Sequence, residues 1–419
     1  MSVLNSAVRL WRARRVTLLS GTFFFVLAAA LLRAGMNETA PEPSPSEPIL
    51  GGRRIFEAKG CAQCHSVGEG KTESQVGPDL ADKAASWSDL MRFAGMLWNH
   101  LPEMEEQMRL HKIEHPPLLP EEMGKLTAYL FHVKLVGPPG DANRGRDLFE
   151  QRLCVRCHQF KGRGGTVGPR LDELKNFNSA FFLARTLWNH GPEMAEKMKE
   201  LGITQLRLGT DDVSDIVAFL RNGAGTPGPM ELAYTASGTP RLGEVLFREK
   251  GCSLCHASSG SGGTIGPDLI RQTPNMNISE LAGAFWNHGA PMRAKMKELS
   301  VPYPVFSDAE MSNLIAYLAF IQYSGPRGDP AKGKEIFRGK SCATCHPVAG
   351  EGAKVGPDLA SSNATRSVPD WAAAMWNHAP AMREKFREMG RTWPHFDGDE
   401  MRDVVEFLRS SRARSTSNS

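Results

Sequence analysis

The residues best suited to chemistry in this 419-residue chain are cysteine pairs that are each followed by a histidine. The pattern Cys-x-x-Cys-His occurs four times, at Cys61-Ala-Gln-Cys64-His65, Cys154-Val-Arg-Cys157-His158, Cys252-Ser-Leu-Cys255-His256 and Cys342-Ala-Thr-Cys345-His346. These motifs contain all eight cysteines of the sequence. The cysteines therefore have to be explained as motif residues.

Two thiols three positions apart can each add across a vinyl group of one porphyrin, and the next residue then places an imidazole under the iron. This is the signature of covalent c-type haem attachment. A single pair would also be compatible with a redox-active dithiol or half of a zinc site. Four copies with the histidine in the same place favour haem over both alternatives. We expect four covalent haems, with proximal iron ligands His65, His158, His256 and His346.

Each motif lies within a longer repeated unit. A phenylalanine precedes each first cysteine by five residues, and a glycine precedes it by four more, in the pairs Gly52 and Phe56, Gly145 and Phe149, Gly243 and Phe247, and Gly333 and Phe337. Gly-Pro-x-Leu follows each motif, beginning at Gly77, Gly168, Gly266 and Gly356. Trp-Asn-His comes next, beginning at Trp98, Trp188, Trp286 and Trp376, with an aromatic residue 31 positions later, at Tyr129, Phe219, Tyr317 and Phe407. Constant spacing indicates one structural unit copied four times.

The repeat predicts an all-α protein of four tandem domains, each a small helical bundle around one haem. We expect these domains at residues 51–136, 141–222, 241–323 and 329–410. In each, a short helix leads into the haem loop, as at 53–58. A second helix carries Trp-Asn-His, and the proline that follows is expected to start a third. A last helix closes the unit, with a capping box at Ser307-Asp-Ala-Glu310.

The segments between the domains are rich in glycine and proline. The linker at 223–240 is the longest, so we expect two pairs of domains, one on each side of it. Residues 411–419 are polar and are predicted to be a disordered tail.

The N-terminal segment, residues 1–36, contains the apolar run 16–32. Its 17 residues lie at the lower limit of a spanning helix and just above a signal-peptide core. Ala28-Ala29-Ala30 could serve as a small-residue cleavage site, but the apolar run continues past it and ends at Arg33. We therefore favour an uncleaved membrane anchor over a cleaved signal peptide. In either case the chain after Arg33 is exported. Residues 37–50 are predicted to be an extended proline-rich linker.

The charge of the chain argues against a nucleic-acid partner. The formal net charge is +4, but five arginines precede the first acidic residue, so the remainder carries 4 − 5 = −1; they are Arg9, Arg12, Arg14, Arg15 and Arg33. Haem propionates would lower this charge further. A basic nucleic-acid-binding surface is therefore not expected.

With these landmarks, each unit resembles the class I, mitochondrial-type cytochrome c domain. The resemblance implies that the glycine and aromatic residue of the first helix pack against an aromatic residue of the last. It implies that a proline carbonyl holds the proximal imidazole through Nδ1, a role that falls to Pro78, Pro169, Pro267 and Pro357. It also implies a compartment outside the cytoplasm, here the bacterial periplasm, where the attachment machinery of this family works.

The sixth iron ligand is less clearly marked, because the usual Met-Pro segment of the resembled family is missing. The favoured candidates lie four residues after the Trp-Asn-His histidine, at Met104, Met194, Met292 and Met382. A second set lies four residues later, at Met108, Met198 and Met296, where the fourth copy has Phe386. The third set is the histidines themselves, His100, His190, His288 and His378. Soft sulfur ligation in cytochromes c and presence in every copy favour the first set.

The remaining histidines, His111, His115, His132 and His395, have no equivalents in the other units and are predicted to lie on the surface. The repeated tryptophans are interpreted either as core residues or as haem-edge contacts whose N–H bonds a propionate.

Together these features predict an exported, membrane-tethered tetrahaem electron carrier. Its partners would be redox proteins, including subunits of a membrane respiratory complex, and the membrane itself through the N-terminal helix. The alternative is a haem enzyme that reduces peroxide or another small molecule at one open haem site, in the fourth domain if the later methionine is the ligand.

Overall fold

The computed structural model describes residues 47–68, 76–81, 87–173, 180–223, 238–258, 261–270 and 276–417. The predicted N-terminal anchor lies outside these residues. In the part of the chain that is described, no helix has both the length and the apolar character needed to cross a membrane.

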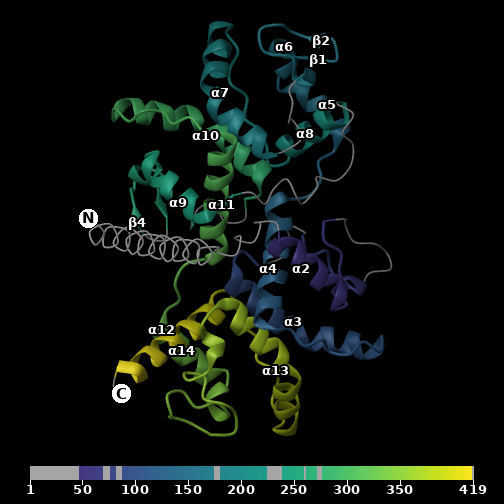
Figure 1. Cartoon of the computed structure of the whole chain (residues 1–419), viewed down its shortest axis with the longest axis vertical. Helices are drawn as coiled ribbons and strands as arrows, with labels where there is room; N and C mark the ends of the chain where they lie inside the picture. Colours follow the sequence, from purple (N-terminus) through teal and green to yellow (C-terminus); the bar gives the residue numbers. More distant parts are fainter. Residues whose placement is uncertain are drawn as a thin grey trace, which may run out of the picture. The chain divides into compact units, whose positions relative to one another are not determined.

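The described chain is almost wholly helical and consists of four similar domains (Figure 1). Domain 1 contains α2 (Glu47–Ala58), η1 (Cys61–Gln63), α3 (Leu90–Leu110) and α4 (Pro120–Val136). Domain 2 contains α5 (Ala142–Gln151), α6 (Cys154–Cys157), β1 (Gln159–Phe160), β2 (Arg163–Gly164), η2 (Leu171–Glu173), α7 (Ala180–Glu200) and α8 (Asp212–Gly223).

Domain 3 contains α9 (Pro240–Glu249), η4 (Cys252–Leu254), β3 (Ala257–Ser258), β4 (Ser261–Gly262), α10 (Ile278–Glu298) and α11 (Asp308–Ser324). Domain 4 contains α12 (Pro330–Gly339), η5 (Cys342–Thr344), η6 (Asn363–Thr365), α13 (Val368–Glu388) and α14 (Glu400–Ser417). The two short hairpins, β1–β2 and β3–β4, are antiparallel.

The first and last helices of each domain cross closely, as the repeated glycine and aromatic residues predict. A Cβ added at Gly52 would overlap the carbonyl of Lys125 and lie 2.6 Å from the Cβ of Tyr129. Only glycine allows this approach of two backbones. One turn further on, the Phe56 and Tyr129 rings have centroids 5.9 Å apart. The other domains repeat the contact at 5.7, 5.5 and 5.8 Å.

The helix that carries Trp-Asn-His does not end at the proline, which corrects the sequence-based expectation. α3, α7, α10 and α13 each run for 21 residues and contain their proline in the interior, at Pro102, Pro192, Pro291 and Pro380. An interior proline removes one helical hydrogen bond. The candidate methionine ligands therefore share one helix with Trp-Asn-His.

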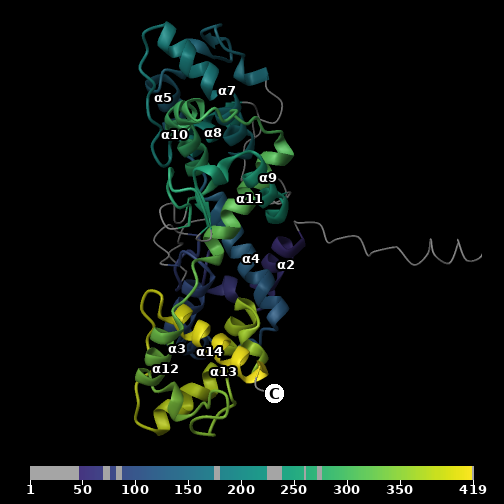
Figure 2. The same cartoon turned by 90° about the vertical axis from the view of Figure 1, so that its left-hand side faces the viewer.

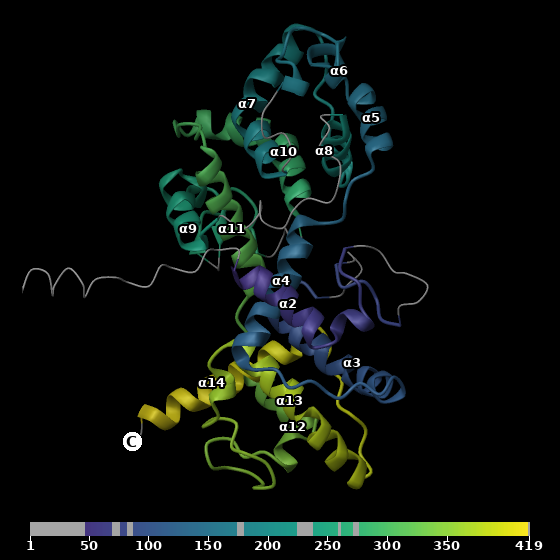
Figure 3. The same cartoon turned by 45° about the vertical axis from the view of Figure 1, so that its right-hand side comes forward.

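The domains pair as 1 with 4 and as 2 with 3, so the expected pairing on either side of the 223–240 linker is wrong. One buried apolar cluster combines residues of domains 1 and 4, and another combines residues of domains 2 and 3. Within the second pair α10 crosses α7, and within the first α13 contacts α3 and α4 (Figures 1 and 3). A buried ion pair at 2.7 Å joins Arg402 of domain 4 to Asp89 of domain 1.

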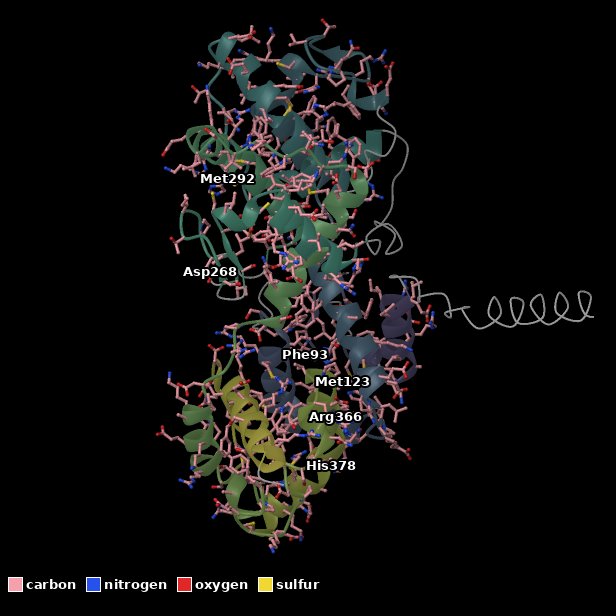
Figure 4. All side chains as sticks on the ribbon, turned by 60° about the vertical axis from the view of Figure 1, so that its left-hand side comes forward. Phe93, Met123, Asp268, Met292, Arg366 and His378 are labelled. Carbon is pink, nitrogen blue, oxygen red and sulfur yellow. The ribbon has the colours of Figure 1, made fainter. Side chains whose placement is uncertain are left out.

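Domain 1 also contacts domain 3, where the end of α11 meets α4 (Figure 2). The Tyr323 hydroxyl donates to the Phe131 carbonyl at 3.0 Å, and the two rings lie 4.4 Å apart. Figure 4 places Phe93 of α3 and Met123 of α4 in the cluster that domains 1 and 4 share; both side chains are buried.

Two terminal expectations are also corrected. α2 begins at Glu47, inside the segment that was predicted to be extended, and Gly51 and Gly52 are buried in it. At the other end α14 continues to Ser417, through most of the predicted disordered tail. Once a helix is nucleated, each further residue adds one hydrogen bond, so polar residues can extend it.

Candidate metal centres

Each Cys-x-x-Cys-His motif begins on a short helical turn directly after the first helix of its domain. The chain enters this turn through a residue with a left-handed backbone, at Gly60, Leu153, Gly251 and Ser341, with φ between 60° and 82°. The histidine N–H then bonds the carbonyl of the first cysteine, at 3.0 Å from His65 to Cys61. Two thiols and one imidazole therefore emerge from a single rigid turn.

A proline carbonyl holds each of these imidazoles, as the resemblance implied. The Nδ1 atoms of His65, His158, His256 and His346 lie 3.0 Å from the carbonyl oxygens of Pro78, Pro169, Pro267 and Pro357. The glycine before each proline lies against the ring: a Cβ at Gly168 would be 2.5 Å from His158 Cε1. An imidazole that donates through Nδ1 presents Nε2 as the metal ligand.

The first thiol of each motif is unlike that of a redox dithiol or a zinc site. Burial raises the pKa of the first cysteine of each motif to about 11, at Cys61, Cys154, Cys252 and Cys342. A redox dithiol needs a lowered pKa, and a zinc site needs thiolates. Within the described ranges, no group of three or more His, Cys, Asp or Glu side chains could hold a metal ion. One oriented imidazole beside two cysteines on the same turn fits haem c.

All candidate sixth ligands lie on the four long helices. Met104, Met108 and Met382 are partly buried against the core of domains 1 and 4, and Met292 (Figure 4) against that of domains 2 and 3. The Trp-Asn-His histidines are exposed, including His378 of α13 (Figure 4). His100 Nδ1 bonds the Met96 carbonyl at 2.9 Å. The assignment of the sixth ligand stays a prediction.

The repeated Trp-Asn pairs have a role that the sequence analysis missed, because they bind the opposite domain of each pair. Trp188 Nε1 donates to the Pro304 carbonyl at 2.8 Å, and the Asn189 side chain bonds both the N–H and the C=O of Phe306. In all four domains a backbone carbonyl of the opposite domain accepts the indole N–H. We call these pairs the Trp-Asn clamps; they are Trp98-Asn99, Trp188-Asn189, Trp286-Asn287 and Trp376-Asn377.

Each clamp holds a four-residue segment that precedes the last helix of the opposite domain. These docking segments are residues 393–396, 303–306, 205–208 and 115–118, in the order of the clamps above. The first residue of a docking segment also donates to the clamp tryptophan's carbonyl. The signal in the sequence was the asparagine that recurs in every Trp-Asn-His motif, because haem binding assigns it no role.

A cation two residues before the first cysteine ties the haem loop to its own domain's docking segment. Lys59 Nζ donates to the Pro117 carbonyl at 2.7 Å and pairs with Glu122 at 3.1 Å. Lys250 and Lys340 repeat both contacts. In domain 2, Arg152 instead pairs with Asp212. The docking segment therefore lies between its own haem loop and the opposite clamp.

Two of the histidines predicted to lie on the surface do not. His132 is 7% exposed, and burial lowers its pKa to about 4. His115 stacks on Trp376 with ring centroids 4.5 Å apart. His111 and His395 are exposed as expected. The two exceptions lie where a neighbouring helix or domain covers the surface of the single domain.

Comparison with known proteins agrees with this geometry. Residues 49–134, 142–224, 241–321 and 330–412 each match the family model described as cytochrome c. A cytochrome bc1 complex cytochrome c subunit of Corynebacterium efficiens is 32% identical over 111 residues. That match covers 26% of this chain and 34% of the relative, so about a third of the relative's length is represented. No solved structure matches the chain.

Proposed function

Because the chain belongs to the cytochrome c family and repeats that domain four times, we propose that this multihaem c-type cytochrome is an exported, membrane-tethered electron carrier. It passes electrons between redox partners of a respiratory chain, or does so as the cytochrome subunit of a larger redox complex. The bound haem supplies one-electron chemistry, because its iron cycles between Fe(II) and Fe(III).

The observation that carries the proposal is that the four proximal imidazoles are held by the same contacts. Each is oriented by one proline carbonyl at 3.0 Å and packed against one glycine. A fixed ligand limits rearrangement when the iron changes its charge, which suits electron transfer. Four centres built alike suit a carrier of several electrons better than an enzyme with one specialised site.

The proposed partner class rests on the relative from Corynebacterium efficiens. Its name describes a cytochrome c subunit of a cytochrome bc1 complex. We carry a respiratory membrane complex over to this chain as the proposed partner, on an alignment that spans a third of that relative.

Export and tethering rest on the sequence. Covalent haem attachment in this family takes place outside the cytoplasm, and the apolar run 16–32 would anchor the chain. The test is extraction of membranes with alkaline carbonate. We expect the full chain to stay in the membrane pellet and a variant with residues 16–32 replaced by a cleavable signal to be released. Release of both proteins would contradict tethering.

Carbon monoxide binding to the fully reduced protein tests the carrier function itself. If all four irons keep two protein ligands, carbon monoxide leaves the optical spectrum unchanged. Binding at about one haem in four would instead support the alternative, a haem enzyme with an open site. Phe386 of domain 4 favours that domain for the open site, because it replaces a methionine found in the other three.

A further inference from the structure

The proline inside each long helix leaves one backbone carbonyl without a helical donor. For Pro192 this is the carbonyl of Trp188, four residues earlier. In α3 and α13 it is again the carbonyl of the clamp tryptophan, at Trp98 and Trp376. In α10 the proline comes one residue later, so the carbonyl is that of Asn287.

In α3, α7 and α13 the opposite domain supplies the missing donor. The Tyr303 hydroxyl donates to the Trp188 carbonyl at 3.0 Å. The tyrosine ring stacks on the indole with a centroid distance of 5.0 Å and an angle of 9° between the ring planes. Trp393 makes the same two contacts with Trp98. Its indole N–H donates to the Trp98 carbonyl at 3.1 Å, and the centroids of the two stacked rings lie 4.0 Å apart. His115 Nε2 lies 3.1 Å from the Trp376 carbonyl. These donors act where the helix would bend.

The part of each helix beyond the proline carries the candidate methionine ligands. We call residues 103–110, 193–200, 292–298 and 381–388 the methionine arms. In three helices the first methionine follows the proline by two residues, and in α10 by one. Helices bend at prolines and where a side chain enters the backbone hydrogen-bond ladder, so a group that bonds the freed carbonyl can influence the direction of the arm.

We propose that Tyr303, Trp393 and His115, the first residues of three docking segments, are positioning residues for the methionine arms of the opposite domains. Domain 3 thereby sets the distal ligand geometry of domain 2, and domains 1 and 4 set that of each other. This inference rests on the proposed function and on the prediction that methionine is the sixth iron ligand. Tyr303 and Trp393 give the clearest tests, because each donates to a carbonyl whose usual helical donor is replaced by a proline.

A matched pair of tyrosine substitutions in the full holoprotein tests the proposal. Tyr303→Phe removes a hydroxyl that donates at 3.0 Å to the Trp188 carbonyl. Tyr323→Phe removes a hydroxyl that donates at 3.0 Å to the Phe131 carbonyl, also between domains but away from any proline. The readouts are the midpoint potentials from a spectroelectrochemical titration and the intensity of the methionine-to-iron charge-transfer band.

We expect Tyr303→Phe to shift one midpoint potential and to weaken the methionine band by no more than the share of one haem in four. Trp393→Phe, which keeps an aromatic ring but loses the N–H, should do the same in the other pair. Tyr323→Phe should leave the potentials and the band at wild-type values. Wild-type behaviour of Tyr303→Phe and Trp393→Phe, or an equal shift in Tyr323→Phe, would overturn the proposal.

The same data bear on the predicted ligand. A wild-type protein without a methionine band would contradict methionine ligation and would overturn this inference with it. The carbon monoxide test of the electron-carrier function has a separate readout, so the two failures can be told apart.

Discussion

Four glycines hold the proximal imidazoles in place by being small. Each lies directly against the ring, and the carbonyl of the next residue accepts a hydrogen bond from Nδ1–H. Any side chain at this position would push the ring off its carbonyl. The requirement is thus steric at the glycine and electronic at the proline, and both act on one imidazole.

Gly168→Ala tests this arrangement in domain 2. The added Cβ would lie 2.5 Å from His158 Cε1, so the ring has to move and its bond to Pro169 weakens. We expect one midpoint potential to shift and the free energy of unfolding to fall by about 1–3 kcal/mol.

Gly339→Ala is the control, because no atom lies within 4 Å of its added Cβ and it is the exposed last residue of α12. It should change the free energy of unfolding by no more than about 0.5 kcal/mol and leave the potentials unchanged. Equal effects of the two substitutions would refute the steric argument.

Buried His132 predicts a pH dependence of stability. Burial lowers its pKa from 6.5 to about 4, so between these pH values the unfolded chain binds a proton that the folded chain does not. Stability is complete above about pH 6.5 and falls as the pH drops, by up to about 3 kcal/mol near pH 4. His132→Gln should reduce this loss when denaturant unfolding is compared at pH 7 and about pH 4.5.

Exposed His111 provides the matched control in the same domain. His111→Gln should keep the wild-type dependence on pH. If His132→Gln also keeps it, the buried imidazole does not control acid stability.

At the scale of elements, each long helix offers a tryptophan and an asparagine to the docking segment of the opposite domain. In α3, α7 and α13 the docking segment also bonds the carbonyl that the proline leaves without its helical donor. The clamp is reciprocal, because both members of a pair carry both parts.

Asn189→Ala measures one clamp. The asparagine bonds the Phe306 N–H at 3.0 Å and the Phe306 carbonyl at 2.7 Å, and its loss leaves both backbone groups unpaired at a partly buried site. We expect the free energy of unfolding to fall by about 1–3 kcal/mol in thermal or denaturant unfolding. Asn143→Ala, at an exposed asparagine of α5 in the same domain, should change it by less than about 0.5 kcal/mol. If Asn189→Ala lowered the free energy of unfolding no more than Asn143→Ala does, the clamp would contribute little to stability.

At the scale of the molecule, the pairing joins the first domain to the last and the two middle domains to each other. Residues from both members complete each shared core. Cutting the chain between domains therefore has different consequences at different linkers.

Two fragments of two domains each test this organisation. Fragment 137–325 contains both clamps of the pair of domains 2 and 3 together with their docking segments. Fragment 45–224 contains two clamps whose docking segments lie in domains 3 and 4. We expect the first to unfold in one cooperative transition at a temperature at least about 5 °C higher than the second. Equal thermal stability of the two fragments would contradict the pairing.

Much of each single domain could be predicted from the sequence. The haem motifs, the contact of Gly52 with the last helix, the Pro78 carbonyl on His65 and the capping box of Ser307 all appear in the structure as predicted. These features are local or recur at constant spacing within one unit, so a pattern in the sequence contains both partners of each contact.

The tertiary structure alone decided which domains pair, what the Trp-Asn clamps bind and which groups bond the carbonyls freed by the helix prolines. Each of these contacts joins segments that lie from about 80 to 300 residues apart, and no spacing in the sequence connects them. A linker limits how far a domain can reach, but the face that it buries is chosen by the complementarity of two surfaces. The hydroxyl that bonds the Trp188 carbonyl beside Pro192 comes from another domain, so no pattern within one unit could predict this bond.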